Sequence, residues 1–248
     1  MSFKPPEAEF DPGLCTKLNE IFLGKTVAVF GCGRGNYVEI LREVASLVIG
    51  VESDPVQLAT RQPSEMLNYR LADLTEPLWI GRCFDFVLCL ELGQHVSPDR
   101  SPILIENLDR HAKEGIILSW QQVESVDPPS INAVLNEEIE ARFAALGYVT
   151  DDARRDNLRE GASLACYRGS LMALSRKQSP AFYCAQFIGG PLHRKMLELN
   201  SLPQKYLWTN PIPDPALNTG FIPGCRTHRY GLHDSLIDNQ STYFYEGG

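Results

Sequence analysis

Three glycines at every second position follow a short apolar run, and an acidic residue ends the next apolar run. The first run is 27–30, the glycines are Gly31, Gly33 and Gly35, and the acid is Glu52. Glycine permits tight backbone turns and the close approach of a ligand that a Cβ would prevent. Glu52 follows Gly31 by about 20 positions, the spacing at which an acid binds a pair of ribose hydroxyls. These residues predict a site for an adenosine-type cofactor.

Polar side chains also follow two later apolar runs. Asp73 comes after one run, and Glu91, Gln94 and His95 come at or after the end of the run FDFVLCL. A histidine with an ordinary pKa near 6.5 suits general-base catalysis at cytosolic pH. Ligands of a parallel sheet bind outside the carboxyl ends of its strands, so we expect these side chains to lie at one edge of the sheet.

Apolar runs alternate with helical patterns through the first 178 residues, which predicts an α/β fold. The expected sheet is doubly wound, mostly parallel and covered by helices on both faces. Helices are expected at 12–23, 36–45, 55–60, 101–113 and 131–146 and in part of the segment up to 168, and strands at 27–30, before 52, and at 68–71, 84–90, 115–120 and 170–176. The pairs Asp11-Pro12 and Asp54-Pro55 are typical of helix starts.

The overall composition is that of an ordinary globular protein. The chain has 248 residues, a net charge of −8 and a pI of about 5.2. Nucleic-acid binders usually present a basic face, so this balance argues against a nucleic-acid partner. No apolar run approaches the ~20 residues of a membrane span. The first residues contain no apolar signal-peptide region, so a cytoplasmic location is expected. The seven cysteines are scattered, which predicts reduced thiols and no zinc site.

The composition changes after about residue 178. Seven prolines interrupt the remainder, and aromatic residues are frequent there, which is not typical of a disordered tail. We predict two parts, a domain at 1–178 and an irregular, Pro- and aromatic-rich C-terminal extension at 179–248. Only 193–200 has a helical pattern. The extension is expected to pack on the first domain or on a second subunit, which would make a homodimer.

The first part resembles the class I S-adenosylmethionine (SAM)-dependent methyltransferases. The matching segments, in order, are VAVFGCGRGNY, VIGVESD, LADLTEP, FDFVLCLELGQHV and RHAKEGIILSW. The resemblance implies a seven-stranded sheet, SAM as the cofactor and methyl transfer as the activity. A nicotinamide-binding domain is the rival interpretation. Its G-x-G-x-x-G fingerprint would require glycine at the position of Asn36, so the glycine spacing favours the methyltransferases.

The resemblance also implies roles for individual residues. The turn at Gly31, Gly33 and Gly35, with its neighbours Phe30 and Cys32, would pass under the methionine part of SAM. Glu52 would accept hydrogen bonds from both ribose hydroxyls, with Ser53 beside the adenine. Asp73 would accept a hydrogen bond from the adenine amino group, next to the backbone amide of Leu74. Leu90 and Glu91 would lie near the methionine part and the transferring methyl.

One position departs from the family pattern. Most members have an acid two residues before the first glycine, where this chain has Val29. That acid helps to anchor the ammonium end of the cofactor. The backbone carbonyls of the glycine turn and Glu91 are the candidates to replace it here.

Catalysis by methyl transfer needs an aligned acceptor and, for a hydroxyl or protonated amine, a base. His95 is the predicted base, with a structural histidine as the alternative. Glu91 is expected to contact cofactor or substrate, and Gln94 to orient a polar atom of the substrate or to be solvated. Trp120 is expected to line the substrate site or to pack in the core. His111 is expected at a helix end, and no metal is expected, although His193, His228, His233 and Asp234 lie in the extension.

Together these residues predict a SAM-dependent methyltransferase that acts on a hydroxyl or amine of a small-molecule metabolite. The N-P-P-aromatic motif of nucleic-acid amino-methylating enzymes is absent after the run 84–90, where the chain reads Leu90-Glu91-Leu92-Gly93. A protein or peptide methyltransferase is the first alternative. A SAM-binding protein that does not methylate is the second, because Val29 replaces the usual acid.

Overall fold

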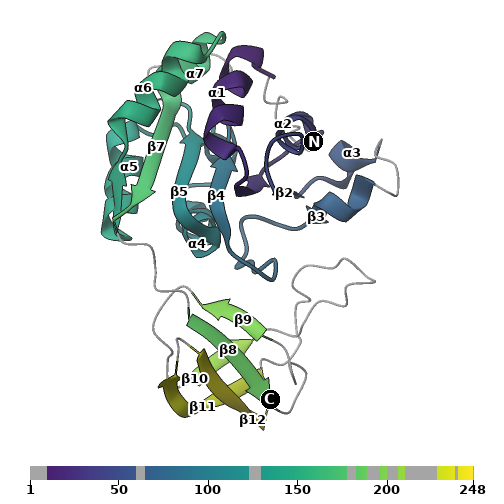
Figure 1. The fold of residues 1–248 in the computed structure, drawn as a ribbon. Coiled ribbons are helices and arrows are strands. Elements are labelled where there is room, and N and C mark those ends of the chain that lie inside the picture. The colour runs from purple at the N-terminus through teal and green to yellow at the C-terminus, as the bar shows by residue number, and fades with distance from the viewer. Residues whose placement is uncertain are drawn as a thin grey trace. The chain divides into compact units, whose positions relative to one another are not determined.

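The computed structural model describes residues 10–59, 65–122 and 130–177, together with the backbone of five strands between 183 and 247 (Figure 1). The chain divides into two compact units. The first comprises Met1–Pro77 and Phe84–Gln178, and the second comprises Leu78–Cys83 and Ser179–Gly248.

Strands and helices alternate along the first unit, as the sequence predicts. Its elements are α1 (Pro12–Phe22), β1 (Thr26–Phe30), α2 (Asn36–Leu41), β2 (Leu47–Glu52), α3 (Pro55–Leu58), the 3-10 helix η1 (Glu65–Asn68), β3 (Tyr69–Leu71), β4 (Phe84–Cys89), the 3-10 helix η2 (Gly93–His95), α4 (Ser101–His111), β5 (Ala112–Ser119), α5 (Asn136–Ala145), β6 (Tyr148–Thr150), α6 (Asp152–Gly161), α7 (Ala165–Ser170) and β7 (Leu171–Arg176).

The sheet of this unit has seven strands in the order β3-β2-β1-β4-β5-β7-β6. The first five strands of that order are parallel, whereas β7 pairs antiparallel with both β5 and β6. This confirms the predicted doubly wound, mostly parallel sheet. The chain runs outward from β1 to β2 and β3, and then returns to place β4 on the other side of β1. The strand order therefore reverses between β1 and β4, where ligands of such sheets bind.

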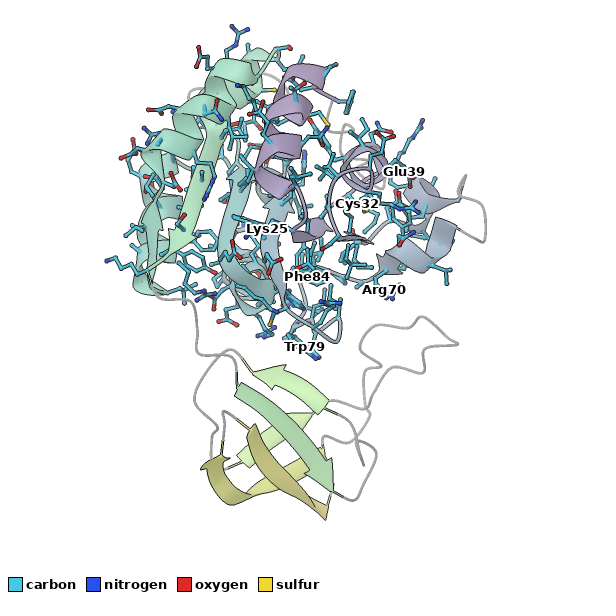
Figure 2. The ribbon with its side chains drawn as sticks, viewed as in Figure 1. Lys25, Cys32, Glu39, Arg70, Trp79 and Phe84 are labelled. Atoms are coloured by element: carbon cyan, nitrogen blue, oxygen red, sulfur yellow. The ribbon has the colours of Figure 1, made fainter. Side chains whose placement is uncertain are left out.

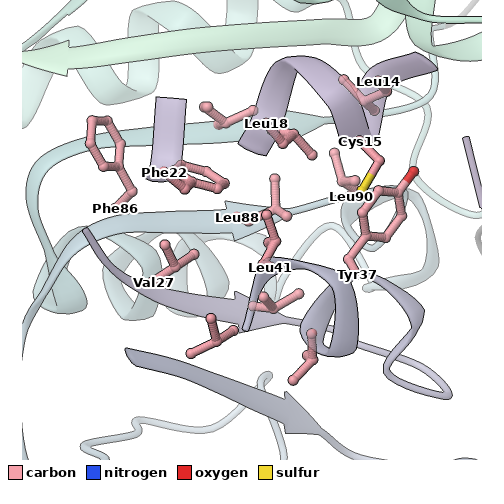
Figure 3. Close-up of a cluster of buried hydrophobic side chains, with 14 of the residues drawn as sticks. Leu14, Cys15, Leu18, Phe22, Val27, Tyr37, Leu41, Phe86, Leu88 and Leu90 are labelled. Carbon is pink, nitrogen blue, oxygen red and sulfur yellow. The ribbon is translucent and has the colours of Figure 1, made fainter. Parts of the chain in front are cut away.

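One face of the sheet is covered by α1, α2, α6 and α7, which share a cluster of buried apolar side chains (Figure 3). Helix α1 starts where Asp11 accepts a hydrogen bond from the amide of Leu14 (2.9 Å), followed by proline in the first turn. Its buried residues recur at helical spacing and lie against Phe86 and Leu88 of β4. Each fully buried side chain of this size contributes about 1.5–3 kcal/mol, so this packing fixes the strand ends that carry the site.

The opposite face of the sheet is covered by α4. Successive strand residues point to opposite faces, so Val29 of β1 joins the cluster under α1 while Phe30 points the other way. The ring of Phe30 lies 5.2 Å from that of His111, at the end of α4. Both faces of β1 are thus buried, which explains the uninterrupted apolar run in the sequence.

Some element ends are shifted from the prediction, since α2 ends at Leu41 and β5 begins at Ala112. Two further details of the first unit also differ. Helix α5 begins at Asn136 rather than near 131, because the segment before it is bonded to the ends of the central strands. Ile131 donates its amide to the carbonyl of Gln94 (3.2 Å), and Val134 donates to that of Gln121 (3.0 Å). The short edge strand β6 was not predicted, because three residues are too few to show an alternating pattern.

The second unit contains a separate five-stranded sheet and is more regular than the sequence predicted. Its strands are β8 (Tyr183–Ile188), β9 (Met196–Leu199), β10 (Tyr206–Thr209), β11 (His228–Ile237) and β12 (Gln240–Gly247), in the order β10-β11-β12-β8-β9. The prediction of a helix at 193–200 is wrong for the residues of that segment that the structure describes. Met196–Leu199 is a strand that pairs antiparallel with β8. A short apolar run does not distinguish a helix from a strand, and pairing with β8 decides the outcome here.

Candidate functional site

The glycine turn at the carboxyl end of β1 has a left-handed backbone at all three glycines. The φ angles of Gly31, Gly33 and Gly35 are 70°, 53° and 82°. A Cβ at Gly35 would collide with the hydroxyl of Tyr69, and one at Gly31 would lie 3.0 Å from Leu92. A Cβ at Gly33 would meet nothing within 4 Å. The outer two glycines are therefore required by packing, whereas Gly33 leaves its backbone open to a ligand. Lys25 and Cys32, labelled in Figure 2, lie just before and just after β1.

Glu52, at the end of β2, ties the glycine turn to its own strand. Its carboxylate is mostly buried, with 8% of the residue exposed. One oxygen, Oε2, accepts the amide of Gly33 (2.7 Å), and Oε1 accepts the amides of Ser53 (2.9 Å) and Asp54 (3.0 Å). A carboxylate offers about four lone-pair positions. Oε2 thus has fewer protein donors than Oε1 and can accept from a ligand, while backbone donors fix the position of Glu52.

Asp73 follows β3 and lies beside the end of β2. Ala72 donates its amide to the carbonyl of Glu52 (2.9 Å), which brings the two strand ends together. The Asp73 carboxylate is exposed and accepts the amide and hydroxyl of Thr75 (2.8 and 2.7 Å). The fully buried Asn107 of α4 donates to the carbonyl of Leu74 (3.0 Å) and so holds this loop. Glu52, Asp73 and the glycine turn therefore share one edge of the sheet.

Glu91 follows β4 and has an unusual backbone. Its φ is +50°, the one left-handed angle of a residue other than glycine in the described part of the chain. Its amide donates to Ser119 Oγ at the end of β5 (2.9 Å). Its carboxylate accepts a hydrogen bond from Gln94 Nε2 (2.8 Å), and Ser170 Oγ of α7 lies 3.3 Å from Oε1. Such backbone angles persist where the surroundings fix them and are common at functional sites.

Gln94 and His95 belong to η2, directly after Glu91. Gln94 is almost fully buried, and its Oε1 lies 3.4 Å from the amide of Gln121, which donates to it. Burial lowers the pKa of His95 below its ordinary value, although the negative charge of Glu91 acts in the opposite direction. The imidazole of His95 is therefore neutral near pH 7 and able to accept a proton.

Trp120 lies beneath this turn, with 1% of its surface exposed. Its indole Nε1 donates to the carbonyl of Asn132 (2.7 Å), and its ring occupies the space that a Cβ at Gly93 would need. Asn132 in turn donates to Ser101 Oγ (2.7 Å). Trp120 thus supports η2 from below, and its contact with a substrate stays a prediction. Glycine at position 93 is the signal of this close packing.

His111 occupies the helix end that the sequence predicted for it. Its Nδ1 lies 2.7 Å from the carbonyl of Asn107, one turn earlier in α4. Burial lowers its pKa to about 4, which the hydrogen bond to Asn107 opposes. His111 is therefore a neutral, structural residue on the face under Phe30.

Tyr167 and Ser170 of α7, which approach Glu91, had no signal in the sequence. Burial raises the pKa of Tyr167, and the neighbouring Tyr37 adds to this effect. The negative charge of Glu91 raises this pKa further, so the Tyr167 hydroxyl lies within the electrostatic influence of that carboxylate. Tyr37 of α2 shares a hydrogen bond with Tyr167, and its hydroxyl accepts the amide of Asp11 (3.1 Å). The start of α1, the glycine-turn helix and α7 are thus linked through buried hydroxyls.

Two negative findings apply to the described residues only. They contain no group of three or more His, Cys, Asp or Glu side chains that could hold a metal ion. The side chains of His193, His228, His233 and Asp234 lie outside the described residues. None of the helices in this part of the chain is long and apolar enough to cross a membrane.

Residues 29–119 match the sequence profile of a family described as a methyltransferase domain. This segment contains the glycine turn, Glu52, Asp73 and the Glu91–His95 turn. The chain carries a class I SAM-dependent methyltransferase domain. No curated protein sequence matches the chain.

Solved structures with the methyltransferase fold are similar to this domain at low sequence identity. The sugar N-methyltransferase KedS8 from Streptoalloteichus sp. ATCC 53650 has a TM-score of 0.52 and 14% identity, covering 72% of this chain and 99% of that one. A TehB-like SAM-dependent methyltransferase from Corynebacterium glutamicum has a TM-score of 0.51 and 12% identity, covering 67% and 88%. The SAM-bound magnesium protoporphyrin IX methyltransferase from Synechocystis PCC 6803 has a TM-score of 0.50 and 17% identity, covering 66% and 76%.

SAM is the cofactor of this methyltransferase domain, and the described residues fit it. The open side of Gly33 admits a ligand against the backbone, as the glycine turn of such a site requires. Glu52 and Asp73 follow neighbouring strand ends, and each has carboxylate oxygens that accept hydrogen bonds. Phe30 is fully buried against His111, so only its backbone is available to a cofactor. Cys32 is half-buried beside Gly50 and donates its amide to Val51 (3.1 Å).

Proposed function

We propose that this methyltransferase domain transfers a methyl group from SAM to a hydroxyl or amine of a small-molecule metabolite. The observation that supports this most directly is the arrangement after β4. Glu91 and His95 lie on one turn, and Leu92 between them packs on Gly31, so the turn lies against the glycine turn. An acid and a neutral base are thus next to the proposed cofactor site. We assign the reaction to residues 1–178 and no step of it to residues 179–248.

The cofactor-binding roles follow the geometry of the sheet edge. The backbone at Gly31, Gly33 and Gly35 would hold the methionine part, together with Leu90. Glu52 would accept hydrogen bonds from the ribose hydroxyls, since Oε2 has the fewest protein donors. In the proposed arrangement Ser53, Asp73 and the amide of Leu74 surround the adenine. When bound, SAM supplies a methyl group on a positively charged sulfur, which leaves readily as the neutral thioether of S-adenosylhomocysteine.

His95 would act as the general base of the reaction. A hydroxyl or a protonated amine must lose a proton when it receives the methyl group, and a positioned base contributes typically 10²–10⁴-fold. Burial keeps the pKa of His95 low, so its imidazole is neutral and accepts that proton near pH 7. Gln94 fixes the turn by its bonds to Glu91 and Gln121 and would orient a polar atom of the substrate. Trp120 would act on the same site by supporting this turn from beneath.

A substrate screen tests this proposal. The purified protein is incubated with SAM that carries a radiolabelled methyl group and with a panel of metabolites bearing hydroxyls or amines. We expect label on at least one small molecule, with S-adenosylhomocysteine (SAH) formed in equal amount. Label on a partner protein and on no metabolite would instead support a protein methyltransferase. Tight SAM binding with no SAH formed across the panel would support a SAM-binding protein that does not methylate.

A further inference from the structure

The direction of the cofactor across the sheet follows from the strand order. Glu52 and Asp73 lie at the ends of β2 and β3, which form one edge of the order β3-β2-β1-β4. A ligand with its adenosine at that edge extends over the glycine turn of β1 toward β4. The far end of both SAM and SAH is an amino acid with an ammonium and a carboxylate group. The ammonium therefore needs a counter-charge near the junction of β1 and β4.

Strand β1 supplies no such charge. Val29 is 3% exposed and belongs to the apolar cluster, and Phe30 packs on His111. Neither side chain can approach an ammonium group. Of the two candidates, the carbonyls of the glycine turn and Glu91, only Glu91, in the turn that follows β4, carries a full negative charge.

Glu91 is the acid of that turn, and in the part of the chain that the structure describes its carboxylate has neutral partners. Among the described residues, the donors to its carboxylate are the side-chain amide of Gln94 and the hydroxyl of Ser170, both neutral. The single Ser170 proton is also shared with the carbonyl of Cys166, at 2.8 Å. No ion pair to Glu91 forms with any cationic side chain in the described ranges 10–59, 65–122 and 130–177. A partly buried carboxylate with neutral donors alone favours the binding of a cation.

The position of Glu91 is fixed from both sides. Leu92, the next residue, is in contact distance of Gly31, and the Glu91 amide is held by Ser119. These contacts keep the left-handed backbone of Glu91, which an ordinary residue rarely adopts. The acid is therefore held against the first glycine of the turn and not carried on a free loop.

We infer that Glu91 binds the ammonium group of the cofactor's amino-acid end, and that Gln94 and Ser170 position its carboxylate. The inference rests on the proposed function, in which Glu91 serves the cofactor and His95 the acceptor. It explains how this chain holds SAM with a valine at position 29. It also gives different roles to Glu91, which binds the cofactor, and His95, four positions later on the same turn, which serves the acceptor.

Two ligands distinguish this role in a calorimetric titration of the full chain. SAH contains the amino-acid end, whereas 5′-methylthioadenosine has the same nucleoside and sulfur but lacks that end. We expect Glu91→Gln to weaken SAH binding about 10- to 100-fold, the loss of one charge-assisted hydrogen bond, and to change methylthioadenosine binding less than about threefold. Asp99→Asn, which removes an exposed charge eight positions later, is the control and should alter neither affinity.

Further variants keep the test decisive. Glu91→Gly removes the carboxylate and suits the left-handed backbone. It should therefore weaken SAH binding more than methylthioadenosine binding, even if Glu91→Gln folds poorly. Ser170→Ala should weaken SAH binding about two- to fivefold, because a neutral donor contributes less. Equal weakening of both ligands, or none, in Glu91→Gln and Glu91→Gly would overturn the inference and leave the proposed function standing. Failure of the wild-type chain to bind SAH would overturn both.

Discussion

The two ends of the proposed cofactor site are built in different ways. At the adenosine end, most bonds of the acids are to residues close to them in the chain, since Glu52 holds Ser53 and Asp54, and Asp73 holds Thr75. The bond of Glu52 to the Gly33 amide is the long-range exception among them. At the methyl end, Glu91 is held by Ser119 and Ser170, and the turn rests on Trp120 and Asn132. Local bonds of the first kind leave a pattern in the sequence. Long-range bonds of the second kind do not, and they are where specificity for an acceptor can vary without changing the cofactor site.

Removal of the Glu52 carboxylate should have the largest effect, because it acts on the adenosine end shared by every ligand. Glu52→Ala loses the two proposed ribose hydrogen bonds, each worth about 1.5–3 kcal/mol, and the bond to the Gly33 amide. We expect both SAH and methylthioadenosine to bind about 100-fold weaker or worse by calorimetry. If SAH binds Glu52→Ala as it binds the wild type, the ribose role is wrong.

Substitution of His95 should act on the methyl end alone. His95→Ala should lower turnover by about 10²–10⁴ at saturating SAM, because the base is lost, and leave SAH affinity within about twofold. The readout is the rate of SAH formation with the acceptor found in the screen. Nearly normal turnover would reduce His95 to a structural residue.

Substitutions of Gly33 and Gly35 should affect SAH binding and folding stability to different extents. Gly35→Ala places a Cβ against the Tyr69 hydroxyl in a left-handed backbone and should destabilise the fold by about 3 kcal/mol in urea unfolding. Gly33→Ala meets open space and should cost only about 1 kcal/mol of folding stability, yet it should weaken SAH binding more than Gly35→Ala does. The opposite ranking would mean that the ligand does not approach Gly33.

The pH dependence of turnover should report the electrostatic effect of Glu91 on His95. Turnover should fall as the pH drops through the pKa of His95, because the protonated imidazole cannot accept a proton. That pKa is lowered by burial and lies below 6.5, so the acid limb lies below pH 6.5. Glu91 raises this pKa, and Glu91→Gln should therefore move the limb to still lower pH. An acid limb that stays in place or moves to higher pH would show that the charge of Glu91 does not raise the pKa of His95.

The sequence predicted the central sheet, the helix start at Asp11 and the sheet edge that gathers the glycine turn, Glu52 and Asp73. These features depend on hydrophobic period, on capping residues and on strand ends, which local patterns reveal. It did not predict the support of the methyl end by Ser119, Asn132 and Ser170. Their bonds join segments far apart in the chain, and a serine or asparagine in such a segment has no distinguishing pattern. The strand at Met196–Leu199 was missed for the same reason, since its partner in β8 decides its structure.

The most direct test of the account is calorimetric titration of the full chain with SAM and SAH, with NAD as the control. The glycine spacing, the open side of Gly33 and the placement of Glu52 and Glu91 predict micromolar binding of both sulfur ligands and none of NAD. Binding of neither SAM nor SAH, or preferential binding of NAD, would contradict the account.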